Sequence, residues 1–456
     1  MPAALLVSKS PPLCGELTVH GAKNSVLPIL AATLLCRTPC VLHNCPDILD
    51  VTHTLQILRH LGCSCERSGS TLSIDPRGFA ENAVPPALAG SMRASSLFLG
   101  ALLARTGAAA LTLPGGCPIG ARPIDYHLQA FRALGASAEE EGGTVRCRAD
   151  RLHGARLRLP GPSVGATENA MLAALGADGC TTIENAACEP EIADLGAFLC
   201  ACGADGVTTI YNAAREPEIV DLQNFINAMG GNVRGAGGSI ITVEGRRALH
   251  GGTYRIIADR IVGATYLCAA ACCGGEVRLR GVDPRPLSTV SGALSEAGCT
   301  VKSGEDDVFL QSDGSLRSIR PVRTAPYPGF PTDAQPVLMA ALLKSAGSTV
   351  FVENIFENRY RHVDELARMG AEVRVAGRVA VVTGRENLHG ARVKCTDLRA
   401  GAAMVIAALC AEGTTTIEDA HYIERGYEDI IGKFSAIGGK IRRIETFEGN
   451  SQSAAG

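Results

Sequence analysis

Seven segments of the chain share one order of apolar and polar residues. Each starts with a run of β-branched and aliphatic residues, passes through a turn, and ends in an amphipathic stretch closed by a Gly. This order predicts a strand, a loop and a helix, because Gly readily takes the left-handed conformation that ends a helix. The strands are expected at 41–44, 111–114, 181–185, 208–212, 277–281, 350–354 and 415–419, with the closing glycines at Gly62, Gly135, Gly203, Gly230, Gly298, Gly370 and Gly438.

A second pattern, an apolar helix of about 12 residues entered through a polar loop, occurs six times. These helices are apolar on nearly every face, which predicts that strands and amphipathic helices cover them. Six units, three in each domain, are the simplest interpretation. The entry loops lie at 21–25, 91–95, 164–169, 259–265, 331–335 and 396–400.

The chain has seven strand–helix segments but six apolar helices, because one strand–helix segment occurs as a tandem copy. Residues 179–205 and 206–232 are identical at 16 of 27 positions. One strand–helix unit is therefore duplicated without its buried helix. A surface insertion adds little loop-closure entropy, so we expect a tolerated insertion. The second copy runs directly into the apolar segment 239–243 and is expected to keep the regular place.

Composition narrows the class of protein. A chain of 456 residues is long enough for two domains, and its net charge of −3 argues against a nucleic-acid-binding surface. The 18 cysteines lie mostly in aliphatic runs, which predicts buried, reduced thiols rather than a disulfide framework. The N-terminus does not resemble a secretory signal, and no apolar run is long enough to span a membrane. A cytoplasmic protein is expected.

A segment rich in Gly and Pro at 113–127 combines a cysteine with polar and charged residues. Cys117 lies between Gly116 and Pro118 rather than among aliphatic residues, and Arg122, Asp125 and His127 follow it. Glycine allows backbone conformations that are closed to other residues, and proline restricts them. This combination is typical of a mobile loop with a defined shape that carries reacting groups. The sequence therefore predicts that this loop presents its thiol for chemistry.

Cations gather at the predicted loops although the chain is acidic. Backbone N–H groups and the positive end of the helix dipole face each entry loop, and Arg pairs with phosphate or carboxylate through two parallel hydrogen bonds. The set favours a substrate with several negative charges, while for any single Arg a solvated surface charge is an equal alternative. Lys23, Arg93, Arg260 and Arg399 lie in entry loops, and Arg122, Arg359 and Arg425 lie in other loops.

Three side chains could move protons. The Cys117 thiol would lose its proton more readily near several cations and could then act as acid or nucleophile. Asp333 could be a general base or the N-cap of the following helix. His127 is more often structural in such a turn. Phosphate-loop, dinucleotide-loop, HExxH and paired CxxC motifs are all absent, so nucleotide hydrolysis, nicotinamide chemistry and zinc catalysis have no support.

These residues resemble a known family. The segments that carry the resemblance are 21–24, 92–95, 114–125, 331–333, 356–359, 397–399 and 425–427. They are similar to UDP-N-acetylglucosamine 1-carboxyvinyltransferases, enolpyruvyl transferases that begin peptidoglycan synthesis. The resemblance spans nearly the whole chain, and its cysteine loop is highly specific to that enzyme family.

The resemblance implies an α/β (α+β) fold of two domains, an inside-out α/β barrel of six βαβαββ units with the active site in the interdomain cleft. The domains would be 21–257, and 1–20 with 258–456. The implied reaction transfers the enolpyruvyl group of phosphoenolpyruvate to the 3-hydroxyl of UDP-N-acetylglucosamine and releases phosphate, by addition and then elimination. Neither a metal nor another cofactor is implied, and a monomer is expected.

Site residues follow from the same resemblance. Lys23, Arg122 and Arg425 would hold phosphoenolpyruvate, with Asn24 and Arg399 beside it. Cys117 matches the proton donor, which can form an adduct with phosphoenolpyruvate, and Asp333 matches the residue proposed to handle the sugar hydroxyl proton. Lys23, Arg399, Cys117 and Asp333 form the expected catalytic set. The UDP-sugar site would be lined by Arg93, Arg122, Pro123, Ile124, Asp125, Tyr126, Ser163, Val164, Asp333 and Ile355, and Arg359 completes the substrate-binding set.

Two departures and two alternatives accompany this interpretation. The family commonly has an acidic residue after Asp-Arg-Ile, where this chain has Val262, and Cys188 of the first copy replaces Arg215 of the second. A transferase acting on shikimate 3-phosphate would share the fold, although nothing in the resemblance gives it this cysteine lid. A non-catalytic UDP-sugar-binding paralogue would follow if the duplication distorts the site.

Overall fold

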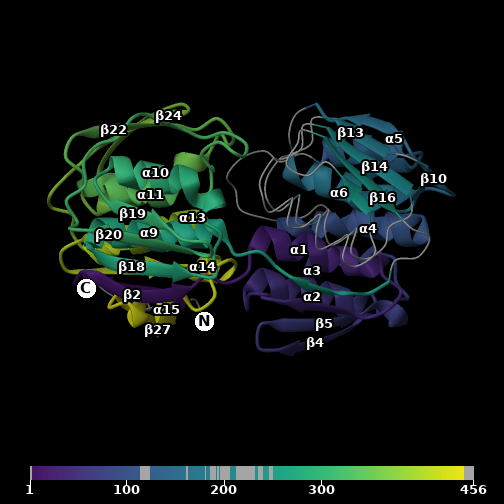
Figure 1. The fold of residues 1–456 in the computed structure, drawn as a ribbon, viewed down its shortest axis with the longest axis horizontal. Helices are drawn as coiled ribbons and strands as arrows, with labels where there is room; N and C mark the ends of the chain where they lie inside the picture. Colours follow the sequence, from purple (N-terminus) through teal and green to yellow (C-terminus); the bar gives the residue numbers. More distant parts are fainter. Residues whose placement is uncertain are drawn as a thin grey trace, which may run out of the picture. The chain divides into compact units, whose positions relative to one another are not determined.

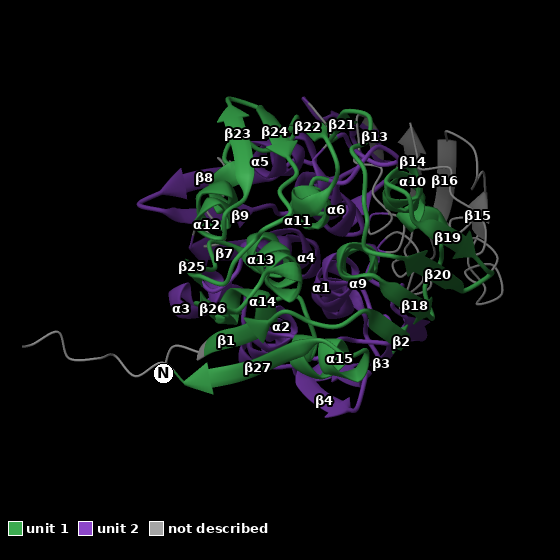
Figure 2. Cartoon of the chain, turned by 90° about the vertical axis from the view of Figure 1, so that its left-hand side faces the viewer, with its two compact units in different colours: residues 1–18, 261–324, 332–456 green, residues 19–260, 325–331 purple. Residues whose placement is uncertain are grey.

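The computed structural model describes residues 3–112, 124–160, 163–179, 181–184, 192, 195, 206–211, 232–234, 240–245 and 250–445. The chain forms two compact units (Figure 2). Unit 1 contains 1–18, 261–324 and 332–456, and unit 2 contains 19–260 and 325–331. Their limits differ from the expected domain limits by two or three residues near 20 and 257, and by the segment 325–331, which the sequence analysis placed in the other domain.

Unit 1 contains three four-stranded sheets, with the strand orders β25-β26-β1-β27, β19-β20-β18-β2 and β21-β22-β24-β23. Its strands are β1 (Ala3–Ser8), β2 (Leu13–Thr18), β18 (Gly275–Arg280), β19 (Thr300–Ser303), β20 (Asp307–Ser312), β21 (Val322–Arg323), β22 (Ser348–Val352), β23 (Glu372–Ala376), β24 (Val379–Thr383), β25 (Arg392–Lys394), β26 (Thr414–Glu418) and β27 (Lys440–Glu445).

Unit 2 contains the sheets β17-β3-β5-β4 and β6-β7-β9-β8, the five-stranded sheet β11-β13-β14-β16-β15, and the pair β10-β12. Its strands are β3 (Cys40–His43), β4 (Ser64–Ser68), β5 (Thr71–Asp75), β6 (Ala83–Val84), β7 (Ala108–Thr112), β8 (Ser137–Glu141), β9 (Thr144–Arg148), β10 (Leu152–His153), β11 (Arg156–Arg158), β12 (Ala177–Asp178), β13 (Thr181–Glu184), β14 (Gly206–Tyr211), β15 (Asn232–Arg234), β16 (Ile240–Gly245) and β17 (Thr253–Arg255).

One strand order recurs in the five four-stranded sheets. An edge strand runs parallel to a second strand, the second pairs antiparallel with a third, and the third pairs antiparallel with a fourth. The predicted repeat of strand and helix units is therefore confirmed. Among the described strands no sheet closes on itself, so the architecture is a set of separate sheets around buried helices.

The duplicated segment explains the fifth strand of one sheet. The two copies contribute β13 and β14, which lie next to each other in parallel, and Thr181, Thr182 and Ile183 pair with Thr208, Thr209 and Ile210. Each residue thus pairs with its own copy 27 positions later. β13 also pairs with β11, and β14 pairs with β16. The second copy keeps the regular place only toward β16, because the first copy has taken the place next to β11.

The amphipathic helices α2 (Leu49–His60), α5 (Asp125–Ala133), α10 (Ser288–Glu296), α12 (Val363–Arg368) and α15 (Ile430–Ala436) follow the predicted strands. A Gly two residues beyond each helix has a positive φ, between +86° and +113°, as the pattern predicted. These glycines are Gly62, Gly135, Gly298, Gly370 and Gly438. Gly203 and Gly230 lie outside the described residues.

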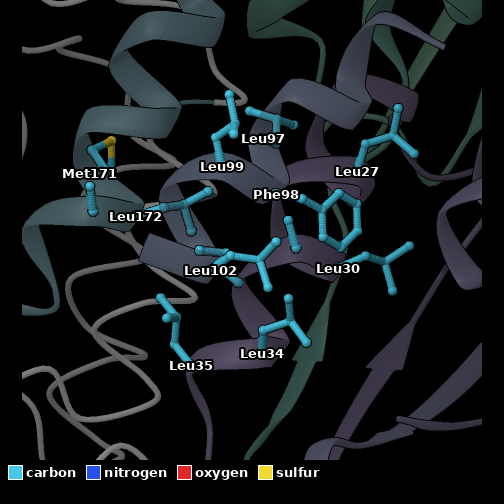
Figure 3. Packing of buried hydrophobic residues seen from close by; sticks show 14 of the residues in the cluster. Leu27, Leu30, Leu34, Leu35, Leu97, Phe98, Leu99, Leu102, Met171 and Leu172 are labelled. Atoms are coloured by element: carbon cyan, nitrogen blue, oxygen red, sulfur yellow. The ribbon is translucent and has the colours of Figure 1, made fainter. Parts of the chain in front are cut away.

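The six apolar helices are buried, as expected. They are α1 (Lys23–Ala32), α4 (Leu97–Thr106), α6 (Val164–Ala174), α9 (Arg260–Cys273), α11 (Gln335–Ala341) and α13 (Leu398–Cys410). In unit 2, Leu30, Phe98 and Leu172 bring α1, α4 and α6 into one core (Figure 3). Gly100 lets α4 approach α6, because a Cβ there would lie 2.6 Å from the carbonyl oxygen of Asn169. In unit 1, Figure 1 shows α9, α11 and α13 with sheets around them.

Short helices complete the described elements: α3 (Pro86–Ala89), α14 (His421–Glu424) and the 3-10 turns η1 (Thr33–Leu35), η2 (Pro76–Gly78), η3 (Arg93–Ser96), η4 (Arg285–Leu287), η5 (Leu342–Lys344) and η6 (Arg359–His362). Every cysteine in the described part is a free thiol and most are buried, which agrees with the prediction of reduced thiols there. No described helix is both long and apolar enough to cross a membrane.

Candidate functional site

Three of the expected site residues meet in unit 1, and we call them the Asp333 cluster. One carboxylate oxygen of Asp333 lies 2.6 Å from an Nη atom of Arg359, and the other lies 3.2 Å from Nε of Arg399. The arginine side chains are 1% and 4% exposed, whereas that of Asp333 is 30% exposed. Two buried cations therefore hold a carboxylate that solvent can reach.

This geometry decides between the two interpretations of Asp333. Helix α11 begins at Gln335 and its N-cap is Ala334, which makes no side-chain capping hydrogen bond. Asp333 precedes that position and its carboxylate is directed to the two arginines. The N-cap interpretation is therefore wrong, and the side chain is oriented by charge.

A buried acid that the sequence analysis missed organises the loops around the cluster. Glu353 is fully buried and follows β22. One of its oxygens accepts hydrogen bonds from the backbone N–H groups of Ile355 and Phe356, at 2.8 and 3.0 Å, and the other accepts one from the Thr332 hydroxyl at 3.0 Å. The Arg359 guanidinium also donates to the Thr332 carbonyl. These contacts fix the residue just before Asp333.

Arg399 is placed by the first turn of α13. Asp397 caps this helix, and its Oδ1 accepts hydrogen bonds from the backbone N–H groups of Arg399 and Ala400 at 2.9 and 3.1 Å. The Arg399 guanidinium lies 5.7 Å from the centroid of the Tyr427 ring, and the Tyr427 hydroxyl is 2.7 Å from that of Thr265. Helix α13, an aromatic ring and α9 thus fix this cation. Two further expected residues of unit 1, Ile355 and Arg425, are half-buried.

In unit 2, Lys23 begins α1 and forms an ion pair that the sequence analysis did not predict. Its Nζ lies 2.7 Å from Oδ2 of Asp50, and the two side chains are 12% and 2% exposed. Its backbone N–H donates to Oδ2 of Asp259 at 3.1 Å. Asp50 lies on the buried face of α2, so this helix and the residue before α9 position the lysine. Asn24, the next residue, is exposed.

His127 is structural, as the sequence favoured. Its Nδ1 accepts a hydrogen bond from the Asn169 amide at 2.8 Å, and the same amide group donates to the Ser96 carbonyl. Burial, aided by the positive charge of Arg93, lowers the pKa of His127 from its usual 6.5 to about 4. The imidazole is therefore neutral at pH 7 and joins α5 to α6.

The expected UDP-sugar residues of unit 2 lie at helix starts. Arg93 begins η3, and Ser163 caps α6 by accepting a hydrogen bond from the Ala166 N–H at 3.4 Å. Their neighbours Val164 and Tyr126 are half-buried, Asp125 is exposed and Ile124 is buried. Backbone N–H groups at helix N-termini favour anions. Cys117, Arg122 and Pro123 lie outside the described residues.

The remaining entry-loop cation has an aromatic partner. The Arg260 guanidinium at the start of α9 lies 5.5 Å from the centroid of the Tyr327 ring. Within the described residues, the one group of His, Cys, Asp or Glu side chains close enough to share a metal ion is Cys272, Cys273 and Cys410, none of which was a candidate. Neither the Asp333 cluster nor the Lys23–Asp50 pair therefore has the ligand set of a metal centre.

Comparison with known proteins assigns this chain to a family. A family model described as EPSP synthase (3-phosphoshikimate 1-carboxyvinyltransferase) matches residues 7–205 and 197–434. The chain is 44% identical over 432 residues to UDP-N-acetylglucosamine 1-carboxyvinyltransferase 2 of Caldanaerobacter subterraneus subsp. tengcongensis, covering 95% of this chain and 97% of the relative. It is 42% identical over 448 residues to UDP-N-acetylglucosamine 1-carboxyvinyltransferase of Xylella fastidiosa, covering 96% and 99%.

Solved structures agree on the fold. The crystal structure of the enolpyruvyl transferase NikO from Streptomyces tendae superposes with a TM-score of 0.79 at 24% identity, covering 97% of this chain and 99% of that one. EPSP synthase from Acinetobacter baumannii superposes with a TM-score of 0.69 at 19% identity, covering 98% and 100%. The expected fold is thereby confirmed, and the chain belongs to the UDP-N-acetylglucosamine 1-carboxyvinyltransferase family of enolpyruvyl transferases.

Proposed function

We propose that this chain transfers the enolpyruvyl group of phosphoenolpyruvate to the 3-hydroxyl of UDP-N-acetylglucosamine and releases phosphate. The observation that carries the proposal is sequence similarity over nearly the whole chain to enzymes named for this reaction. The Asp333 cluster and the Lys23–Asp50 pair support it, because in each a charged side chain that the family resemblance proposed for the reaction is held by a partner of opposite charge.

Asp333 is the group proposed to take the proton of the sugar hydroxyl. A carboxylate has about four lone-pair positions, and the two arginines occupy one on each oxygen. The side chain is 30% exposed, so a ligand can reach it. A carboxylate held in one orientation can accept a hydroxyl proton without reorganising during the reaction.

The chemistry balances with three proton transfers at the reacting atoms. The sugar oxygen attacks C2 of phosphoenolpyruvate while Asp333 takes its proton and the Cys117 thiol gives a proton to C3. In the tetrahedral intermediate the bond from C2 to the phosphate oxygen then breaks, and C3 gives a proton back to the Cys117 thiolate as the double bond returns. The phosphate leaves, and Asp333 releases its proton to the phosphate or to solvent. Lys23, Arg399, Arg122 and Arg425 would stabilise the carboxylate and departing phosphate. No metal or other cofactor takes part.

The UDP-sugar would be bound through residues at helix starts. Arg93, Ser163 and Asp125 begin or cap described helices, and backbone N–H groups there can donate to the diphosphate. Ile124, Tyr126, Val164 and Ile355 would supply apolar contacts. Arg359 acts on substrate through Asp333, because its own side chain is 1% exposed. We further propose that the product enters peptidoglycan synthesis in the cytoplasm and that the enzyme acts as a monomer.

The choice of acceptor tests this proposal. Phosphate release from phosphoenolpyruvate is measured with UDP-N-acetylglucosamine, with shikimate 3-phosphate, or with neither. We expect release with UDP-N-acetylglucosamine alone. Release with shikimate 3-phosphate would instead assign the other transferase reaction. Binding of UDP-N-acetylglucosamine without any release would contradict catalysis and favour a non-catalytic paralogue.

Substitution of Asp333 tests its role in that reaction. Asp333→Asn keeps the shape but loses the proton acceptor, so kcat should fall by about 10²-fold or more. Glu357→Gln is the matched control, because this exposed acid lies in the same unit and pairs with the exposed Arg378. Thermal unfolding shows whether Asp333→Asn is folded. Asp333→Glu is a second variant, which retains the negative charge. An unchanged kcat in folded Asp333→Asn would remove Asp333 from the mechanism.

A further inference from the structure

Three cysteine thiols meet where two buried helices of unit 1 end, and we call them the thiol cluster. Cys272 and Cys273 are the last residues of α9, and Cys410 is the last residue of α13. The Cys410 sulfur lies 3.0 Å from that of Cys272 and 3.3 Å from that of Cys273. All three sulfurs lie within 4.8 Å of one another. Residues 137 positions apart in sequence thus form one compact group of soft donor atoms.

The spacing suits a shared metal ion. A metal 2.3 Å from each thiolate keeps tetrahedrally arranged sulfurs roughly 3.8 Å apart, and a flatter arrangement separates them slightly more. The shorter contacts of the cluster must therefore open by less than about 1 Å, within the reach of small side-chain rotations. Cys272 and Cys410 are 8% and 7% exposed, and Cys273 is half-buried, so an ion could enter on the Cys273 side.

The surroundings favour a cation bound by thiolates. Two helices end at the cluster, and the carbonyl groups of helix C-termini attract positive charge. Lys344 lies near enough to act electrostatically on Cys273 and Cys410. The Lys344 charge would also offset part of the negative charge that several thiolates give a metal complex, whereas Lys9 is paired with Glu412.

The number and type of donors select the ion. Structural zinc sites have four protein ligands, whereas this group has three sulfurs and no His or carboxylate among the described residues. Soft thiolate donors select monovalent copper, which does not require a fourth ligand. We propose that Cys272, Cys273 and Cys410 bind one Cu(I) ion through their three sulfur atoms.

Binding is a ligand exchange without electron transfer. Up to three sulfur–copper bonds form, the thiol protons leave to solvent, and copper enters and stays as Cu(I). The site is separate from the proposed reaction centre, because Arg399 and Cys410 lie at opposite ends of α13, about 17 Å apart along a helix of 1.5 Å rise per residue. Copper would join the ends of α9 and α13 without touching the Asp333 cluster.

Anaerobic titration of the reduced, full-length chain with Cu(I), in competition with a chromogenic Cu(I) chelator, tests the proposal. The native chain should bind one Cu(I) equivalent more than Cys410→Ser and Cys272→Ser. Cys268→Ser is the matched control, since Cys268 is a buried cysteine of the same helix outside the cluster. X-ray absorption of the native complex should show three sulfur neighbours.

Three results would overturn the assignment. These are equal copper binding by the native chain and Cys410→Ser, preferential binding of Zn²⁺ at equal free concentrations, and a Cys273–Cys410 disulfide in the freshly isolated chain by mass spectrometry. If Cys410→Ser does not fold, the half-buried Cys273→Ser replaces it. Phosphate release by the variants should match the native rate, which separates failure of this site from failure of the proposed function.

Discussion

At the scale of single residues, the charged groups of the site are fixed by buried partners of opposite sign. Asp50 holds Lys23, and Arg359 and Arg399 hold Asp333. Paired buried charges need not add stability, but removing one partner leaves the other uncompensated. Orientation of the proposed reacting groups is therefore the main consequence of these pairs, and stability depends on keeping each pair complete.

Asp50→Asn tests this consequence for Lys23. We expect the free energy of unfolding to fall by about 3 kcal/mol, because the buried ammonium loses its counter-ion. The KM for phosphoenolpyruvate should also rise, since the lysine would lose its fixed position. Urea unfolding and steady-state phosphate release measure the two effects.

Asp47→Asn is the matched control for Asp50→Asn. Asp47 is 66% exposed and lies 3.9 Å from Arg67, so its loss should change the unfolding free energy by less than about 1 kcal/mol. Equal, small effects of the two substitutions would show that Lys23 does not depend on Asp50.

His127 makes stability depend on pH. Its folded pKa of about 4 lies below its usual 6.5, so the unfolded chain binds the proton first as pH falls. The contribution of His127 to the free energy of unfolding is fully present above pH 6.5. It is lost as the pH falls toward 4, by on the order of 3 kcal/mol. In His127→Gln, urea unfolding between pH 7 and 4 should show a shallower decline.

The exposed His60 supplies the control for this measurement. His60→Gln should show the same loss of stability between pH 7 and 4 as the native chain. Burial also lowers the pKa of His362 to about 4, so part of this loss should remain in both variants. The same slope in the native chain and His127→Gln would contradict the assignment of a buried neutral imidazole.

Sequence reasoning at this scale selected the candidate residues, but it missed two acids that position them. Lys23, Arg399 and Asp333 were identified because they lie at predicted helix starts with unusual flanking residues. Asp50 and Glu353 were missed, because an acid in an amphipathic helix or after a strand looks like a surface residue. The apolar neighbours of Glu353 at 350–352 were the available signal, since a buried acid must be fully hydrogen-bonded.

At the scale of elements, the pattern predicted one strand, the amphipathic helix after it and the buried helix of each repeat, but not most of the other strands of the sheets. A Gly at a fixed distance after each strand is a strong signal, because Gly readily takes the left-handed conformation that ends a helix. An all-apolar helix is a strong signal too, because such a helix is buried. The place of the duplicated strand was not predictable. Both copies carry the same Thr-Thr-Ile segment, so backbone pairing alone lets either copy lie beside β11.

Deletion of residues 179–205 tests this view of the duplication. The deletion joins Asp178 to Gly206, and β14 can then pair with both β11 and β16, as in the four-stranded sheets. We expect a folded chain with kcat within about 3-fold of the native value, because short surface insertions change loop-closure free energy little. Phosphate release and thermal unfolding measure the outcome.

Deletion of 206–232 is the matched variant, since it leaves the first copy in the same place. Loss of folding in both shortened chains would show that the fifth strand is required. Loss in one alone would show that the copies have diverged in their contacts, with Cys188 and Arg215 the first difference to exchange.

At the scale of the whole molecule, two units were expected from length and from three repeats in each half. The segment 325–331 lies in unit 2 by its contacts, whereas its place in the sequence put it in the other half. The Tyr327 ring near the Arg260 guanidinium is one such contact within unit 2. A cation and a ring 67 positions apart give no local sequence signal.

The measurement that tests the central claim most directly is the mass of the UDP-sugar after incubation of the native chain with phosphoenolpyruvate and UDP-N-acetylglucosamine. The account predicts a product heavier by one enolpyruvyl group, formed in equal amount to the released phosphate, and strongly reduced in Cys117→Ala. An unchanged UDP-sugar in the presence of folded, ligand-binding protein would contradict it.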